Sequence, residues 1–170
     1  MLHWAVKECT CPVAVRYPRG SDRDYTDSAW SAEMGDQGGI CCHRAGDNAT
    51  IITYGSLLQN ALDAAEILEN KGISAKVIRL LTLEPLPVAQ IAEALSQKHQ
   101  VFIMEESCGC GIADSLSCQL QSLIPDAQIH KIDLGRQYIT HGSVSQLYRH
   151  YGLDGQSVAD FVTEVCSCES

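Results

Sequence analysis

Two adjacent carboxylates, Glu105 and Glu106, directly follow a short apolar run at 100–104 that is typical of a buried strand. Open α/β sheets bind ligands beyond the carboxyl ends of their strands, and paired carboxylates placed there can serve as general acid and general base. No histidine lies beside the pair in the sequence. We therefore favour a solvated strand end or a subunit contact over a catalytic pair.

Two further short motifs could carry chemistry. Gly109 and Gly111 form a partial G-x-G motif that could suggest a phosphate-binding loop, although the third glycine of such a loop is missing. His141 and Ser143, separated by one glycine, could pass for a catalytic histidine and serine. A loop histidine before a helix N-cap is the more common arrangement, and we favour it.

Nine cysteines are many for a chain of this size. Three pairs have the spacing C-x-C and none has C-x-x-C, whereas structural zinc sites typically pair cysteines across two to four residues. An odd number also does not fit a closed disulfide framework. We expect reduced thiols and no metal ligands, with a thiol- or metal-binding module as the open alternative. The cysteines are Cys9, Cys11, Cys41, Cys42, Cys108, Cys110, Cys118, Cys166 and Cys168.

The central stretch of the chain predicts a strand–helix–strand unit. A β-branched run at 50–54 is followed by apolar residues at helical spacing, and Gly72 stands where a helix C-cap is expected. A second strand-like run at 75–81 ends before Pro85 and Pro87. Two parallel strands need such a crossover helix. The apolar helical residues are Leu58, Ala61, Leu62, Ala65 and Leu68.

The remaining elements extend this unit to a mixed sheet. We expect a hairpin in which a strand at 40–43 and a turn at 45–48 lead into the strand at 49–54. The sum is an α/β fold, a five-stranded sheet of four parallel strands and one antiparallel strand with helices on both faces. The other predicted elements are strands at 100–104 and 128–134 and helices at 88–95, 112–123, 144–150 after Ser143, and 154–165.

The first third of the chain has a different character. Residues 1–7 resemble the end of a helix and residues 13–17 a buried strand, but neither has neighbours that would place it in a sheet. We expect residues 1–20 to be disordered, packed on the domain in a non-native way, or paired with another chain. Residues 21–38 form a polar, acidic linker, in which Trp30 and Met34 are the bulky apolar residues.

Composition limits the classes of function. With 170 residues and 45% hydrophobic residues, the chain can bury the core of one domain. The net charge of −9 disfavours nucleic acid as a partner. The N-terminus lacks the pattern of a signal peptide, and no apolar run approaches the roughly 20 residues of a membrane-spanning helix. We expect a soluble cytoplasmic chain with no membrane partner.

Several pieces in a fixed order carry a family resemblance: RYPRG, ATIITYG, LEPL, VFIMEES, HGS and GLD. Together they resemble the C-terminal domain of transketolase-like thiamine diphosphate enzymes, and most closely that of the 1-deoxy-D-xylulose-5-phosphate synthase family. The resemblance implies a three-layer sandwich. It also implies that residues 1–20 end a preceding pyrimidine-binding domain, that 21–38 are a linker, and that 39–170 are a transketolase C-terminal-like domain.

The resemblance also says where the chemistry of such enzymes lies. Thiamine diphosphate and magnesium are held by a Gly-Asp-Gly motif and an asparagine pair on an earlier domain, and this chain has neither motif. The activating glutamate of the family belongs upstream as well. The chain alone is therefore expected to bind no cofactor and to supply no catalytic residue.

One substrate-binding residue is implied. The second arginine of RYPRG lies at the substrate phosphate in the synthase family, and that position is Arg19 here. A solvated surface charge is the alternative for Arg19, and Arg16 has the weaker case of the two. Two loops depart from the family, because Glu84 replaces a lysine and the segment 135–137 replaces a Pro-Asp.

Three functional hypotheses follow. The chain is a C-terminal domain that supports assembly and dimerisation of a synthase or transketolase-type enzyme, or a separate small subunit that joins a chain carrying the thiamine diphosphate domains. Its partner is thus a second copy or that other chain. The third hypothesis, from a different class, is a stand-alone thiol- or metal-binding module that reuses the fold.

Overall fold

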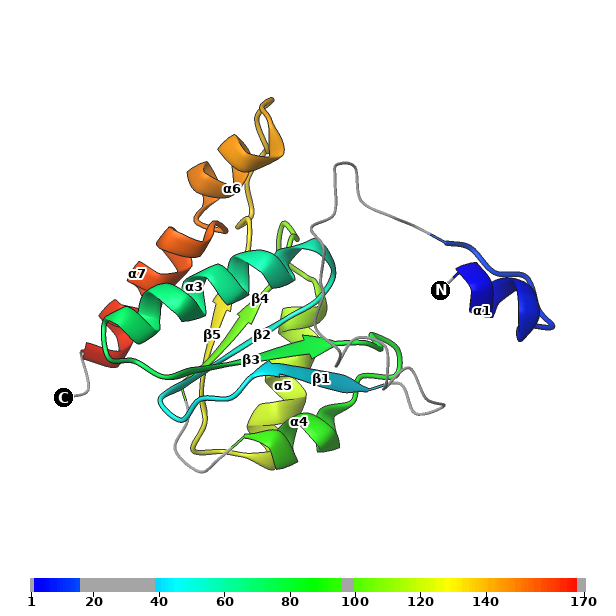
Figure 1. Ribbon diagram of the computed structural model, residues 1–170, viewed down its shortest axis with the longest axis horizontal. Coiled ribbons are helices and arrows are strands. Elements are labelled where there is room, and N and C mark those ends of the chain that lie inside the picture. The colour runs from blue at the N-terminus through cyan, green and yellow to red at the C-terminus, as the bar shows by residue number, and fades with distance from the viewer. Residues whose placement is uncertain (1, 16–38, 96–99, 168–170) are drawn as a thin grey trace.

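The computed structural model describes residues 2–15, 39–95 and 100–167. Its strands are β1 (Ile40–Arg44), β2 (Ala49–Thr53), β3 (Ala75–Leu80), β4 (Gln100–Met104) and β5 (Gln128–Ile132). They form one sheet in the order β1-β3-β2-β4-β5 (Figure 1). Strands β3, β2, β4 and β5 are mutually parallel, and β1 is antiparallel to β3. The predicted mixed sheet of four parallel strands and one antiparallel strand is confirmed.

Helices cover both faces of this sheet, so the predicted three-layer sandwich is also confirmed. On one face, α3 (Leu58–Asn70) and α7 (Gly155–Ser167) pack over a core that includes Ile51 and Phe102. On the other face, α4 (Val88–Ala94) and α5 (Ile112–Leu123) pack over Ile52 and Ile103. Figure 1 shows the two helix pairs on opposite sides of the strands.

The central strands are buried on both faces. Every residue of β2 and of β4 is buried. Their near-continuous apolar sequences, ATIIT and QVFIM, are typical of parallel strands that helices cover from both sides. Successive side chains alternate between the α3/α7 core and the α4/α5 core.

Helix α3 follows a short 3-10 turn, η1 (Gly55–Leu57), and ends as the sequence predicts. Gly72 has a φ of +78°, and its N–H donates to the Glu69 carbonyl over 2.9 Å. The next N–H, that of Ile73, donates to the Leu68 carbonyl over 2.9 Å. These two bonds form a Schellman motif, which needs a residue that tolerates the left-handed conformation.

Replacing Gly72 by alanine is expected to lower the free energy of unfolding by about 1 kcal/mol, because a Cβ atom strains this left-handed backbone. Space is not the cause, since a Cβ atom at Gly72 would meet nothing within 4 Å. Urea denaturation measures the change. Gly72→Asn is the matched control and should recover most of the loss, because asparagine tolerates this conformation. Equal destabilisation by both variants would contradict the explanation.

The predicted hairpin between residues 40–43 and 49–54 is wrong. β1 pairs with β3 instead, with Ile40 opposite Leu80 and Cys42 opposite Ile78. β3 therefore lies between two strands that are consecutive in the chain. The physical reason is that both edges of the buried strand β2 are taken by β3 and β4, so β1 cannot pair with β2 and lies on the outer edge of β3 instead.

The connection from β1 to β2 crosses the start of β3 at close range. A Cβ atom at Gly46 would lie 2.4 Å from the Ala75 carbonyl carbon, so only glycine fits there without a shift of backbone. Asn48 fixes the crossing, because its N–H donates to the Ser74 carbonyl over 2.9 Å and its Oδ1 accepts the Ser74 N–H over 2.8 Å.

The N-terminal expectations are tested only in part. A helix at the start is present as α1 (Leu2–Lys7), whereas residues 13–15 of the predicted strand 13–17 have no strand structure. Residues 16–17 and the linker 21–38 lie outside the described residues. No helix in the described part of the chain is both long and apolar enough to cross a membrane.

Candidate functional site

The carboxyl ends of β2 and β4 meet at the point where the chain connections diverge. From β2 the chain passes to β3 on one side, and from β4 it passes to β5 on the other. Open α/β sheets bind ligands at such a switch point. The two strand ends are tied together by Thr53, whose hydroxyl donates to the Met104 carbonyl over 3.0 Å.

Glu105 lies at this switch point and is buried, with 1% of its surface exposed. Its carboxylate accepts hydrogen bonds from the Tyr54 hydroxyl at 3.2 Å and from the Ser107 hydroxyl at 2.8 Å. It also accepts the backbone N–H of Ala113 at 3.2 Å. The expected solvated strand end is therefore wrong for Glu105, whereas Glu106 is exposed as expected.

The glycine loop is shaped around this carboxylate. A Cβ atom at Gly111 would lie 2.2 Å from Oε1 of Glu105. Ala113 is in the first turn of α5, where helix N–H groups lack internal partners and favour an anion. Glu105 supplies that anion from within the chain. The space that the partial G-x-G motif could have offered to a phosphate is thus filled by a carboxylate.

Tyr54 was not among the residues singled out from the sequence. Burial, reinforced by the neighbouring Glu105 carboxylate, raises the pKa of its phenol to about 12. The phenol therefore stays protonated at neutral pH and donates to Glu105 rather than acting as a base. Tyr54 and Ile52 lie on the same side of β2, so the alternation of the strand could have indicated its position.

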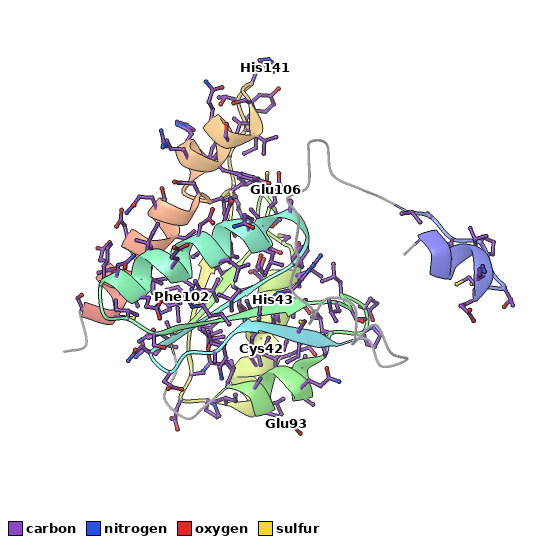
Figure 2. The ribbon with its side chains drawn as sticks, viewed as in Figure 1. Cys42, His43, Glu93, Phe102, Glu106 and His141 are labelled. Carbon is purple, nitrogen blue, oxygen red and sulfur yellow. The ribbon has the colours of Figure 1, made fainter. Side chains whose placement is uncertain are left out.

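The second carboxylate is engaged by helix α6 (Val144–Tyr151). The Tyr148 hydroxyl donates to Oε2 of Glu106 over 3.2 Å and lies 3.4 Å from the Ser56 hydroxyl. Burial is the main cause that raises the pKa of Tyr148. The Ser56 contact lowers this pKa, and the Glu106 carboxylate raises it further. Figure 2 shows Glu106 between the body of the sheet and α6.

His141 and Ser143 form no catalytic pair. Ser143 is the N-cap of α6, as predicted, in a capping box with Gln146. Its hydroxyl donates to Gln146 Oε1 over 2.8 Å, and His141 is exposed at the far end of the loop before α6 (Figure 2). Arg16 and Arg19, the arginines considered for substrate phosphate, lie outside the described residues.

An open groove of about 380 Å³ runs beside β5, lined by residues of β5, of the following loop and of α7. Its lysine, Lys131, is ion-paired with Asp114 on α5. Within the described ranges, no group of three or more His, Cys, Asp or Glu side chains is placed to hold a metal ion.

Residues 38–158, which include the whole of the sheet, match one family model, whose description is transketolase, C-terminal domain. The chain belongs to the transketolase C-terminal domain family. The family resemblance stated from the sequence is thereby confirmed.

Curated relatives of this transketolase C-terminal domain are longer enzymes. It is 37% identical over 171 residues to a 1-deoxy-D-xylulose-5-phosphate synthase of Chlorobium luteolum, covering 96% of this chain and 26% of that enzyme. It is 34% identical to the synthase of Chlorobium phaeovibrioides, covering 94% of this chain and 25% of that enzyme. The chain therefore spans about a quarter of the length of these relatives.

Solved structures support the same fold. A protein described as a split gene transketolase, inactive beta4 tetramer, matches with a TM-score of 0.63 and 26% identity, covering 75% of this chain and 42% of that one. A transketolase of Pichia stipitis matches with a TM-score of 0.57 and 18% identity, covering 76% of this chain and 18% of that one, which supports the fold alone. The chain is thus a transketolase C-terminal domain related to these synthases and transketolases.

Proposed function

We propose that this chain is the C-terminal domain or small subunit of a thiamine-diphosphate-dependent enzyme of the 1-deoxy-D-xylulose-5-phosphate synthase or transketolase type. It assists assembly and dimerisation in a cytoplasmic enzyme and is not catalytic alone. One observation carries the proposal: 96% of the chain aligns with only 26% of a synthase. The rest of such an enzyme supplies the thiamine diphosphate and magnesium sites.

The switch point supports a structural role for this chain. Glu105 is enclosed by three donors of the chain itself, and Glu106 is bonded to Tyr148. A general acid or base needs access to the substrate. Glu105 is buried, and Glu106 is exposed but bonded to Tyr148. In this proposal the two carboxylates therefore hold β4, α5 and α6 in place.

Helix α6 is the surface that we assign to the chain with the cofactor domains. None of its residues is buried, although its last turn and its capping box are well formed. Val144 is 48% exposed, and Tyr138 in the loop before α6 is 92% exposed. Exposed aromatic residues are favoured anchors of protein interfaces. In the assembled enzyme, Arg19 would lie at the substrate phosphate, where a guanidinium binds phosphate oxygens in pairs.

The name of the split gene transketolase offers a parallel. That protein is described as an inactive tetramer of one type of chain. By analogy, we propose that this chain also associates with copies of itself and gains activity only with a chain that carries the cofactor domains.

The proposal is tested by calorimetry with thiamine diphosphate and magnesium. The chain is measured alone and then with the N-terminal three quarters of the Chlorobium luteolum synthase, truncated before the matched region. We expect no binding by the chain alone, and binding with synthase activity in the mixture. Binding by the chain alone would overturn the proposal, as would a mixture that forms no complex and has no activity.

The same mixture tests the α6 surface. Tyr138→Ser should weaken complex formation at least about tenfold if Tyr138 is a buried anchor in the assembly. Leu123→Ser is the matched control, because Leu123 is a 58% exposed apolar residue on α5. Helix α5 lies on the face of the sheet opposite α3 and α7. Equal effects of the two variants would exclude α6 as the docking surface.

A further inference from the structure

The loop before α5 carries two thiols that neither the fold nor the proposed function uses. Cys108 and Cys110 are separated by one glycine, and both are exposed. They lie beside the switch point, directly after Ser107, whose carbonyl accepts the Leu134 N–H over 2.9 Å. The start of this loop is therefore fixed while its thiols face solvent.

The backbone of the loop bends between the two thiols. Gly109 has a φ of +82°, and Cys110 has a φ of +60°, the only positive φ among the described residues other than glycine. A fully extended chain separates residues two apart by about 7 Å, at the outer limit of the roughly 4.4–6.8 Å between Cα atoms in disulfides. The left-handed bend at Gly109 shortens this separation. The bend therefore favours a spacing of the two Cα atoms that a disulfide can span.

One of the two thiols lies beside a cation. Nη2 of Arg136 lies 3.8 Å from Sγ of Cys110, and the side chain of Arg136 packs against Gly109. The Asp114 carboxylate accepts the Cys110 N–H over 2.8 Å and is itself ion-paired with Lys131. A guanidinium beside a thiol stabilises the thiolate, which is the reactive form.

We propose that Cys108 and Cys110 form a redox-sensitive dithiol that exchanges with small disulfides of the glutathione type. The Cys110 thiolate, whose proton has passed to water, attacks one sulfur of the small disulfide and releases one small thiolate, which takes up a proton. The Cys108 thiolate then attacks Sγ of Cys110 in the mixed disulfide and releases the second small thiol. Two cysteine thiols are oxidised to one disulfide, and one small disulfide is reduced to two thiols.

A second cysteine pair in the same chain, Cys9 and Cys11, serves as a comparison for the reactivity of Cys108 and Cys110. This pair has the same C-x-C spacing, and Cys11 is exposed. Burial and the neighbouring Cys11 raise the pKa of Cys9, which opposes thiolate formation there. Cys108 and Cys110 should therefore react before Cys9 and Cys11.

The test uses the reduced full chain and needs no partner chain, so its result is independent of the proposed function. The protein is mixed with oxidised glutathione, quenched with acid and alkylated with N-ethylmaleimide. Proteolysis before Asp114 separates Cys108 and Cys110 from Cys118 for mass spectrometry. We expect a Cys108–Cys110 disulfide to form while Cys118 stays alkylatable.

Variants identify the steps. Cys108→Ser should accumulate the mixed glutathione disulfide at Cys110, and Arg136→Gln should slow disulfide formation about two- to fivefold, the effect of one exposed charge. Cys118→Ser, the matched control, should change nothing. Oxidation of Cys9 and Cys11 before Cys108 and Cys110, or an unchanged rate in Arg136→Gln, would overturn the proposal.

Discussion

Replacing Glu105 by alanine is expected to lower the free energy of unfolding by about 2–4 kcal/mol. The substitution leaves two hydroxyls and one backbone N–H at the start of α5 without their acceptor in a buried place. It also removes the anion from the positive end of the α5 dipole. Urea denaturation of the full chain, followed by circular dichroism, measures the change.

Two variants separate burial from charge. Glu106→Ala is the matched control, because Glu106 is exposed and accepts one bond from Tyr148, so the expected loss is within about 0.5 kcal/mol. Glu105→Gln keeps an acceptor oxygen of similar size and should cost about half as much as alanine. If alanine at positions 105 and 106 had the same effect, Glu105 would not be the anchor of α5.

Gly46→Ala is expected to destabilise the domain by about 3 kcal/mol, because an added Cβ atom meets backbone that has no room to yield. That atom would lie 2.4 Å from the carbonyl carbon and 2.8 Å from the carbonyl oxygen of Ala75. Relief requires the β1–β2 connection to lift away from the start of β3, which strains the bonds between Asn48 and Ser74. Thermal and urea unfolding report the loss.

A second glycine provides the control for Gly46. At Gly142, a Cβ atom would approach the Leu147 side chain at 3.3 Å, and that flexible group can move aside. Neither glycine has a positive φ, so the two alanine variants differ in the space available and not in backbone strain. We expect Gly142→Ala to change stability by less than about 0.5 kcal/mol. A comparable loss in both variants would refute the close-crossing explanation.

The strands and helices of this domain could be predicted because their patterns are local. Apolar runs mark β2 and β4, and the spacing of small and apolar residues marks α3. The pairing of β1 could not be predicted this way. The turn-forming residues 45–48 favour a hairpin locally, but the edge of β2 that such a hairpin needs is taken by β3, which comes later in the chain.

The site shows the same limit. The alternation of side chains along β4 could have predicted that Glu105 is buried and Glu106 exposed. Val101 and Ile103 pack against α4 and α5, and position 105 lies on the same side of the strand. Nothing else in the sequence indicated that these two adjacent glutamates differ in burial. The contact between Glu106 and Tyr148 joins residues 42 positions apart, so no local sequence pattern could predict it.

The position of β3 between β1 and β2 also governs the order in which the sheet can be completed. During synthesis, residues 40–53 emerge before residues 75–80 exist, so the two earlier strands cannot yet stand in their final places. A hairpin between them would be the quickest pairing and a non-native one. The residues of β1 and β2 must therefore stay unpaired, or their hairpin must dissociate, before β3 can insert between them.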